Sequence, residues 1–401
     1  MIDFVLVVFF VFTIQIFLFK DNAKKIPLVF FLTIYHFLFS IIFLSFEEGS
    51  ITDSQNYYSW GLDGLWDSNL GTGFVVQIIY YLSRLGFADY YDFFLVFSGF
   101  SAIGISLIYI SLNEYIKKIQ FNKKINFIFS LSVFIPSFHF WTVAVGKDSL
   151  MVFFYGLLIS SILKYKSLVV GVVSALAIFM IRPHVGICVL LMFFLYFYIY
   201  GFGRGYSSAN EKLGLRFFLV ILFFVFSAIS YSILLGFVQK YSTSGFENLS
   251  DFASSRGDVY AETGSGFSVD SVPYIGRFIL MFLGGIPWSS LGILQIAAMF
   301  EGIILIYFTI KSYTTLRKIK INYKLESDIL ISYRFTVFIF LYAILVAAIL
   351  AYNSTNLGLM VRQRVMIYIP IFVSFVMARM ILLSLISNTQ SGLYKYQKKS
   401  R

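Results

Sequence analysis

Long runs of apolar residues recur along the whole chain and are separated by short polar tracts. A run of roughly 18 apolar residues or more is long enough for a helix to cross a bilayer. We therefore expect an all-α, polytopic membrane helix bundle that forms a single membrane domain over residues 1–401, with about eleven spans. The predicted spans are residues 3–19, 26–46, 92–111, 125–143, 149–163, 167–181, 184–201, 217–237, 291–310, 329–352 and 363–385.

The polar tracts between these spans predict the topology. Six of them hold most of the lysine and arginine: residues 20–25, 117–124, 164–166, 203–216, 311–324 and 395–401. Basic residues are retained on the cytoplasmic side of a membrane. Placing all six tracts there puts the N-terminus outside and the C-terminus inside.

Two longer segments, residues 47–91 and 238–290, then fall outside the membrane. The first contains GFVVQIIYYLSRLGF, whose helical apolar stripe predicts a helix that lies along the membrane surface. The second ends in RFILMFLGGIPW, which is too short to cross and is broken by Gly-Gly and Pro. We expect a re-entrant or interfacial hairpin there.

Composition agrees with this picture and excludes other classes. With 59% hydrophobic and only 13% charged residues, the chain has too little polar surface to enclose a soluble core. The net charge of +11 lies in short tracts between spans, so it indicates topology and not nucleic-acid binding. The acidic N-terminus has no small-residue cleavage site, which predicts a retained first span. One cysteine and three histidines without paired spacing predict no metal site and no cofactor.

Several cations break the topology rule, because they lie at the outer ends of predicted spans. Three tight connections carry most of them, in the motifs GKD, RPH and VRQR. Arginine binds phosphate in a bidentate manner, and lysine contributes a point charge. We expect these cations to bind an anionic lipid headgroup, above all a pyrophosphate; snorkelling of single side chains is the alternative. The residues are Lys147, Arg182, Arg277, Arg362 and Arg364, and the connections could gather all but Arg277 into one pocket.

Three titratable residues are candidate catalytic groups. Asp148 follows Lys147 and is either an ion-pair partner for a cation or a general base. His184 follows Pro183 and is either a base or a structural hydrogen-bonding group. Glu301 lies inside a predicted span, where a carboxylate is either paired with a neighbouring helix or functional. His36 and His139 lie on apolar faces and are expected to be structural.

The outer segment TDSQNYYSWGLDGLW combines carboxylates with aromatic side chains. Aromatic faces stack on sugar C–H surfaces and carboxylates accept hydroxyl hydrogen bonds, so this composition favours sugar binding. An interfacial aromatic belt is the alternative interpretation. The candidate sugar-binding residues are Asp53, Tyr57, Trp60 and Trp66.

Together, these motifs resemble Wzy-type polysaccharide polymerases of O-antigen, capsule and exopolysaccharide repeat units. The resemblance rests on P-x-x-x-F-W followed by GKD (from Pro136 to Asp148), on RPH, on a glutamate in a late span and on R-x-R before the last span. It implies a GT-C-like membrane glycosyltransferase of the bacterial inner membrane whose active site faces the periplasm and needs no metal. Donor and acceptor would be undecaprenyl-pyrophosphate-linked glycans of lipopolysaccharide biosynthesis. A chain-length regulator and a flippase of the same pathway would be partners.

Two other functions fit parts of the same pattern. An O-antigen ligase-like glycosyltransferase would share the cationic pocket and differ in its acceptor. A lipid-linked oligosaccharide flippase or transporter would need cations along a path through the bilayer, whereas here they concentrate at one rim.

Overall fold

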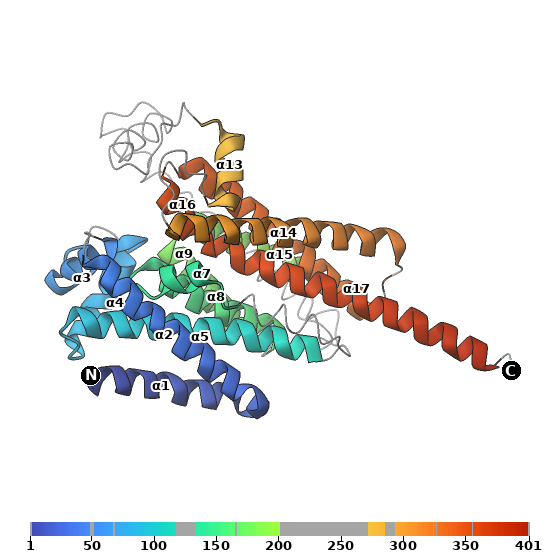
Figure 1. Ribbon diagram of the computed structural model, residues 1–401, viewed down its shortest axis with the longest axis horizontal. Coiled ribbons are helices and arrows are strands. Elements are labelled where there is room, and N and C mark those ends of the chain that lie inside the picture. The colour runs from blue at the N-terminus through green and yellow to red at the C-terminus, as the bar shows by residue number, and fades with distance from the viewer. Residues whose placement is uncertain are drawn as a thin grey trace. The chain divides into compact units, whose positions relative to one another are not determined.

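The computed structural model describes residues 2–48, 52–66, 69–117, 133–164, 167–200, 272–284, 293–323, 325, 327–354 and 356–399. This part of the chain is all-helical, as expected (Figure 1). Its helices are α1 (Ile2–Phe19), the 3-10 helix η1 (Lys20–Lys25), α2 (Ile26–Glu47), α3 (Asp53–Asp63), α4 (Thr72–Arg84), α5 (Tyr90–Lys117), α7 (Pro136–Thr142), α8 (Lys147–Leu163), α9 (Leu168–Ile181), α10 (Pro183–Tyr200), α13 (Tyr274–Leu283), α14 (Ile293–Asn322), α15 (Ser327–Asn353), α16 (Leu357–Gln363) and α17 (Val365–Lys399).

Several of these helices are suited to a membrane. Five of the described helices, α2, α5, α14, α15 and α17, are long and apolar enough to cross it, or six spans result if the bent pair α7 and α8 counts as one. Large apolar side chains are exposed along them: on α14, Phe300 is 65% exposed and Ile303 and Ile310 follow on the same face. Such a continuous apolar face requires an apolar surrounding. The number and length of these apolar helices therefore indicate a multi-pass membrane protein.

The predicted spans correspond to helices wherever the structure describes them, but three helices continue well beyond the predicted ends of their spans: α5 to Lys117 instead of 111, α14 to Asn322 instead of 310, and α17 to Lys399 instead of 385. Helix α14 continues because the basic tract that follows contains no glycine or proline to stop it. The predicted span 125–143 is described only from residue 133, where α7 begins at Pro136. Span 217–237 and most of the outer segment 238–290 lie outside the described residues.

The chain divides into two compact units. The first comprises Met1–Gly186 with Arg379–Arg401, and the second comprises Ile187–Ala378. The division falls within α10 and α17. The single domain over 1–401 stays a prediction.

Helix α5 is the centre of the first unit. Residues 101–113 are all buried, and α5 packs against α8, α1 and α2 (Figure 1). The tightest approach is to α8, where a Cβ on Gly104 would lie 2.5 Å from the carbonyl oxygen of Val152. A Cβ on Gly156 would lie 2.4 Å from the carbonyl oxygen of Gly104. Two glycines thus allow the backbones of α5 and α8 to touch.

Polar side chains on α5 form a series of buried contacts with its neighbours. Four serines make these contacts: Ser98 to Ser40, Ser101 to His36, Ser106 to Gln15, and Ser111 to Ser160. No water is available inside a bilayer to satisfy such groups, so helices that carry them must face one another. The contacts set the rotation of α1, α2 and α8 about α5.

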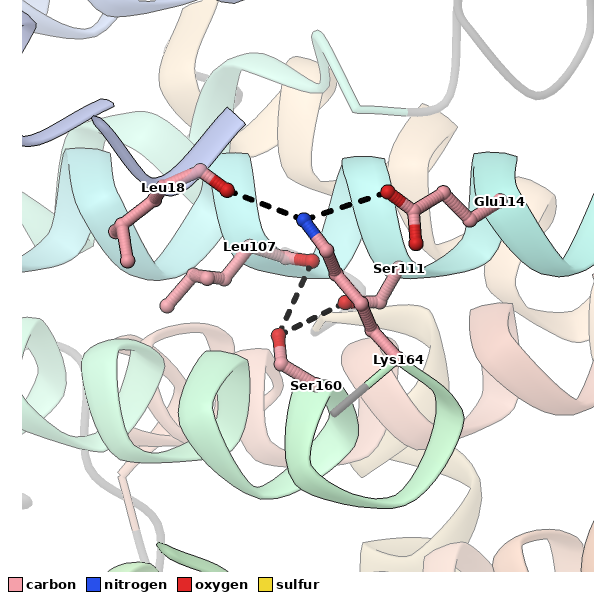
Figure 2. A network of polar contacts seen from close by, with 6 residues as sticks. All are labelled: Leu18, Leu107, Ser111, Glu114, Ser160 and Lys164. Atoms are coloured by element: carbon pink, nitrogen blue, oxygen red, sulfur yellow. Dashed lines mark hydrogen bonds and ion pairs between the residues drawn. The ribbon is translucent and has the colours of Figure 1, made fainter. Parts of the chain in front are cut away.

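At one end of the first unit, Lys164 joins three helices (Figure 2). Its ammonium group lies 3.3 Å from the Glu114 carboxylate of α5 and donates to the Leu18 carbonyl of α1, 3.1 Å away. These are the ends of α1, α5 and α8 that adjoin the basic tracts 20–25, 117–124 and 164–166. The three helix ends that precede these tracts therefore lie at one end of this unit, as the predicted topology requires.

The opposite end of the first unit carries the hairpin of α3 and α4. Glu47, the last residue of α2, is buried and accepts hydrogen bonds from Thr52 and from Tyr90, the first residue of α5. The apolar stripe of α4 packs on α3, because Ile79 is fully buried against Gly61. The stripe that predicted a surface helix is thus largely covered within the protein.

The segment before α8 bends sharply. Helix α7 meets α8 at 113° across residues 143–146. The hydroxyl of Ser98 donates to the Val143 carbonyl, 2.8 Å away, and so satisfies a backbone acceptor of the bend. The GKD motif therefore opens a helix directly after a bend.

The second unit packs α13 between α14 and α15 and places α16 at its rim. A Cβ on Gly302 would lie 2.4 Å from the Leu283 carbonyl oxygen, so α13 and α14 touch through a glycine. The Phe308 and Phe375 rings stack with centroids 4.5 Å apart and join α14 to α17. Helix α13 ends at Gly284, whose φ of 79° requires glycine. This confirms the predicted break at Gly-Gly.

Candidate functional site

Arg182 lies at a one-residue break between two helices of the first unit. Helix α9 ends at Ile181 and α10 begins at Pro183, whose ring suits a first helical turn. The Arg182 carbonyl accepts from the amides of Val185 and Gly186, at 3.0 and 2.8 Å, and opens α10. The arginine side chain leaves this break and is only 7% exposed. The RPH motif is therefore a helix junction, as expected.

Asp148 holds the Arg182 side chain. Its Oδ1 lies 2.6 Å from Arg182 Nη2, and the carboxylate is 2% exposed. Asp148 is in the first turn of α8, where the helix dipole also favours a negative charge. Removing one partner of such a buried pair leaves an uncompensated charge and destabilises the protein by about 3–5 kcal/mol. Asp148 therefore pairs with an arginine 34 residues away, one of its two expected roles, and the general-base role stays a prediction.

The guanidinium of Arg182 keeps one donor open. Its Nε is buried and has no hydrogen-bond partner among the described residues. Leaving a buried donor unsatisfied costs about 1–3 kcal/mol, and more when the group is charged. Such a group is a natural contact for an anionic ligand.

Further polar groups surround this corner. Lys147 and His184 are both half-buried, and His184 lies close enough to interact electrostatically with Lys147 and with Arg182. The Gly71 amide, just before α4, donates to the Met180 carbonyl, 2.7 Å away, and ties the outer hairpin to the end of α9. The motifs GKD and RPH therefore come together beneath that hairpin.

The outer hairpin contributes one predicted sugar-binding residue to this corner. Tyr57 is buried, and Lys147 Nζ lies 5.8 Å from its ring centroid. Asp53 is exposed in the first turn of α3, and Trp60 is 41% exposed one turn after Tyr57. Trp66 packs edge-on against Tyr80, with centroids 5.2 Å apart. Of the four predicted sugar-binding residues, Asp53 and Trp60 are therefore the exposed ones.

A second arginine–carboxylate pair lies in the second unit. Arg364 occupies the turn between α16 and α17, and its Nη2 lies 3.3 Å from Oε2 of Glu301 on α14. Its Nη1 donates to the carbonyls of Ala298, at 2.8 Å, and Phe282, at 3.4 Å. Arg364 and Glu301 are 4% and 7% exposed. Glu301 is thus a helix-to-helix partner, one of its two expected roles.

Gly284 makes room for the Arg364 guanidinium. A Cβ at this position would lie 2.4 Å from Arg364 Nη1. The sequence indicated a helix break at this glycine but carried no signal that an arginine 80 residues later fills the space. Tyr368, one turn beyond Arg364, interacts electrostatically with both members of the pair. The contributions of Gly284 and Tyr368 to this site were not predicted from the sequence.

The remaining predicted cations also lie in the second unit. Arg277 on α13 is buried, and its Nη1 donates to the Tyr352 carbonyl at the end of α15, 3.0 Å away. Its Nε has no hydrogen-bond partner in the described chain. Arg362 is half-buried in the last turn of α16.

The structure brings the predicted site residues together in two groups. Lys147, Asp148, Arg182, His184 and Tyr57 form one group in the first unit, and Glu301 with Arg364 forms another in the second. The single pocket that joins both groups stays a prediction.

Comparison of the chain with protein-family models, with curated proteins and with solved structures finds no match.

Proposed function

We propose that the protein polymerises undecaprenyl-pyrophosphate-linked oligosaccharide repeat units, with O-antigen as the product. A hydroxyl oxygen of the incoming repeat unit attacks the anomeric carbon of the growing chain. The bond from that carbon to the pyrophosphate oxygen breaks, and undecaprenyl pyrophosphate leaves. The hydroxyl proton passes to a base, for which Asp148, His184 and Glu301 are the candidates.

The open donor of Arg182 is the observation that carries this proposal. The reaction increases the negative charge on the leaving pyrophosphate, so donors that bind this charge lower the barrier. Arg182 is held from one side by Asp148 and keeps its Nε open. Lys147 adds a second positive charge at the same corner.

The sugar part of the substrates would contact the α3–α4 hairpin. Trp60 and Asp53 are exposed there, and the hairpin is tied to the Arg182 corner through Gly71. A phosphate contact and a sugar contact thus lie on neighbouring elements, which favours a glycan with a phosphate-linked carrier.

The proposal includes a membrane arrangement. Eleven spans, an N-terminus outside, a C-terminus inside and a GT-C-like helical arrangement would place both arginine groups toward the periplasm of a bacterial inner membrane. The helix ends that precede three basic tracts meet at Lys164, at the other end of the first unit, which supports this orientation. A chain-length regulator and a flippase of the same pathway are the proposed protein partners.

The banding of lipopolysaccharide from a deletion strain tests the function. We expect core that carries a single repeat unit, because the ligase still transfers unpolymerised units. Unsubstituted core would indicate a ligase or a flippase instead, and an unchanged ladder would remove the protein from this pathway.

Arg182→Lys tests the residue that carries the proposal. Lysine keeps the charge but loses the planar fork of donors. Loss of a charged hydrogen bond of about 1.5–3 kcal/mol in the transition state lowers the rate roughly tenfold to more than a hundredfold. The complemented strain should therefore show short ladders at normal protein levels. Arg317→Lys, the same exchange at an exposed arginine of α14 in the predicted cytoplasmic tract 311–324, is the control and should leave the ladder unchanged.

A further inference from the structure

Two buried histidines of the first unit contact each other through their Nδ1 atoms. His36 on α2 and His139 on α7 are both 0% exposed, and their Nδ1 atoms lie 2.9 Å apart. His36 Nε2 lies 2.7 Å from the Ser101 hydroxyl of α5, and His139 Nε2 lies 2.7 Å from the Val133 carbonyl. The pair thus joins three helices beside the bend that precedes Lys147.

The partners determine where the protons lie. A backbone carbonyl only accepts, so His139 Nε2 must carry a proton and donate it to Val133. A neutral His139 then has a bare Nδ1, which accepts a hydrogen bond. His36 Nδ1 must therefore carry the single proton between the two rings. The geometry assigns opposite tautomers to the two histidines.

His36 has room for one further proton. The Ser101 hydroxyl can donate to His36 Nε2, or it can donate to the Ser98 carbonyl, 3.0 Å away, and accept from His36. Rotation of one hydroxyl group accommodates either state. His139 has no such freedom, because a proton on its Nδ1 would point directly at the His36 proton.

Among the described residues, the side chains and backbone groups that contact the two rings carry no charge that would offset a second proton. Helix α2 contributes Tyr35, whose ring packs edge-on against His139 with centroids 4.8 Å apart and whose hydroxyl donates to Phe134. Phe39 stacks on the His139 ring. Helix α5 presents Ser98 and Ser101. The hydrogen-bond partners that the described residues offer to the two rings are all uncharged.

We propose that His36 and His139 form a one-proton latch that docks α7 onto α2 and α5. The latch holds with one proton between the rings and opens when His139 gains a second. Because α7 leads directly into the bend at 143–146, opening the latch displaces the start of α8, where Lys147 and Asp148 lie. The latch therefore makes the geometry of that corner sensitive to protons, whatever ligand the corner binds.

Thermal unfolding of the purified full chain in detergent tests the latch. Below about pH 6.5 both histidines of the unfolded chain bind an added proton. The closed latch binds at most one, on His36, so the unfolded chain binds more protons than the folded chain. Acid must therefore favour the open state, and the stabilisation is lost as the pH falls. His139→Asn keeps an acceptor oxygen near the Nδ1 position but cannot gain a proton. Between about pH 7.5 and 5.5 we expect the wild-type midpoint to fall roughly 2–5 °C further than that of the variant. Equal pH dependence in the two proteins would refute the latch.

Ring ¹⁵N resonances provide a second test, in which His36 and His139 themselves are left unchanged. The chain has three histidines, and His184→Asn removes the third signal. At neutral pH one remaining ring should carry its proton on Nδ1 and the other on Nε2. Identical tautomers at both rings would contradict the proton assignment.

Discussion

Two arginines at helix breaks, Arg182 and Arg364, differ in how fully their donors are used. Arg364 binds two carbonyls and Glu301, so its terminal nitrogens are occupied by the protein itself. Arg182 has one carboxylate partner and an unpaired Nε. A fully paired arginine fixes helices, whereas one with an open donor can bind a ligand. Among the proposed phosphate contacts that the structure describes, Arg182 and Arg277 each keep an unpaired Nε, and of these two only Arg182 lies beside a second cation of the set, Lys147.

The fit of Arg364 against Gly284 leads to a stability prediction. Gly284→Ala adds backbone strain of about 1–2 kcal/mol and overpacking of about 1–3 kcal/mol, because the new Cβ would overlap the guanidinium. Gly64 has the same left-handed backbone conformation, with φ 68° and ψ 26°, and a Cβ there would meet only ordinary contacts at 3.4 Å or more, so Gly64→Ala reports strain alone. The thermal midpoint in detergent should fall more for Gly284→Ala. Equal losses would show that Arg364 adapts freely.

At the scale of residues, the sequence predicted which buried carboxylates need a partner but not which cation each one binds. The cost of a buried charge predicted that Asp148 needs a cation and that Glu301 needs a partner. Lys147 adjoins Asp148 in the chain, yet the partner is Arg182, because the return of α9 alongside α8 brings the junction back to that point. Pairing of this kind depends on helix packing, which local sequence does not contain.

At the scale of elements, long helices were predictable and short ones were not. A window of about 18 residues detects a span but averages over any break within it. Helices α7, α13 and α16 each have ten residues or fewer. They are marked by Pro136, by Gly284 and by the cap Asn356, whose side chain accepts from the Leu359 amide. Such signals locate a break but leave the direction of the next helix open.

The contact between α5 and α8 can be tested with alanine. Gly104→Ala and Gly156→Ala each place a methyl group within 2.5 Å of facing backbone, which cannot rotate away. We expect each to destabilise the protein by about 1–3 kcal/mol or more. Gly99→Ala on α5 is the control, since its Cβ would meet only side chains, Val11 at 3.0 Å and Val7 at 3.9 Å. Unfolding midpoints that fall equally for all three would argue against a backbone contact.

At the scale of the whole molecule, the helix ends that precede three basic tracts and the Arg182 corner lie at opposite ends of the first unit. Lys164 gathers one set of helix ends, and Glu47 with Tyr90 gathers the other. Positive-inside counting predicted which helix ends share a side, and the first unit confirms that grouping. Which side is the cytoplasm requires a measurement in cells.

Cysteine labelling makes that measurement. In a Cys188→Ala background, Ala88→Cys and Gly358→Cys should react in intact cells with an impermeant thiol reagent, because both positions are exposed and predicted to lie outside. Lys24→Cys and Lys320→Cys, equally exposed, should react only after the cells are opened. The reverse pattern would invert the topology and place the Arg182 corner in the cytoplasm.

The bend between α7 and α8 also constrains the order of biosynthesis. Seven residues of helix extend about 10 Å, a third of the roughly 30 Å hydrocarbon core. The insertion machinery therefore cannot release α7 into lipid as a span of its own. Its anchors, His36 and Ser98, belong to helices made earlier, so α7 must wait until α2 and α5 have assembled. Maturation of the corner at Lys147 is consequently a late event that follows membrane integration.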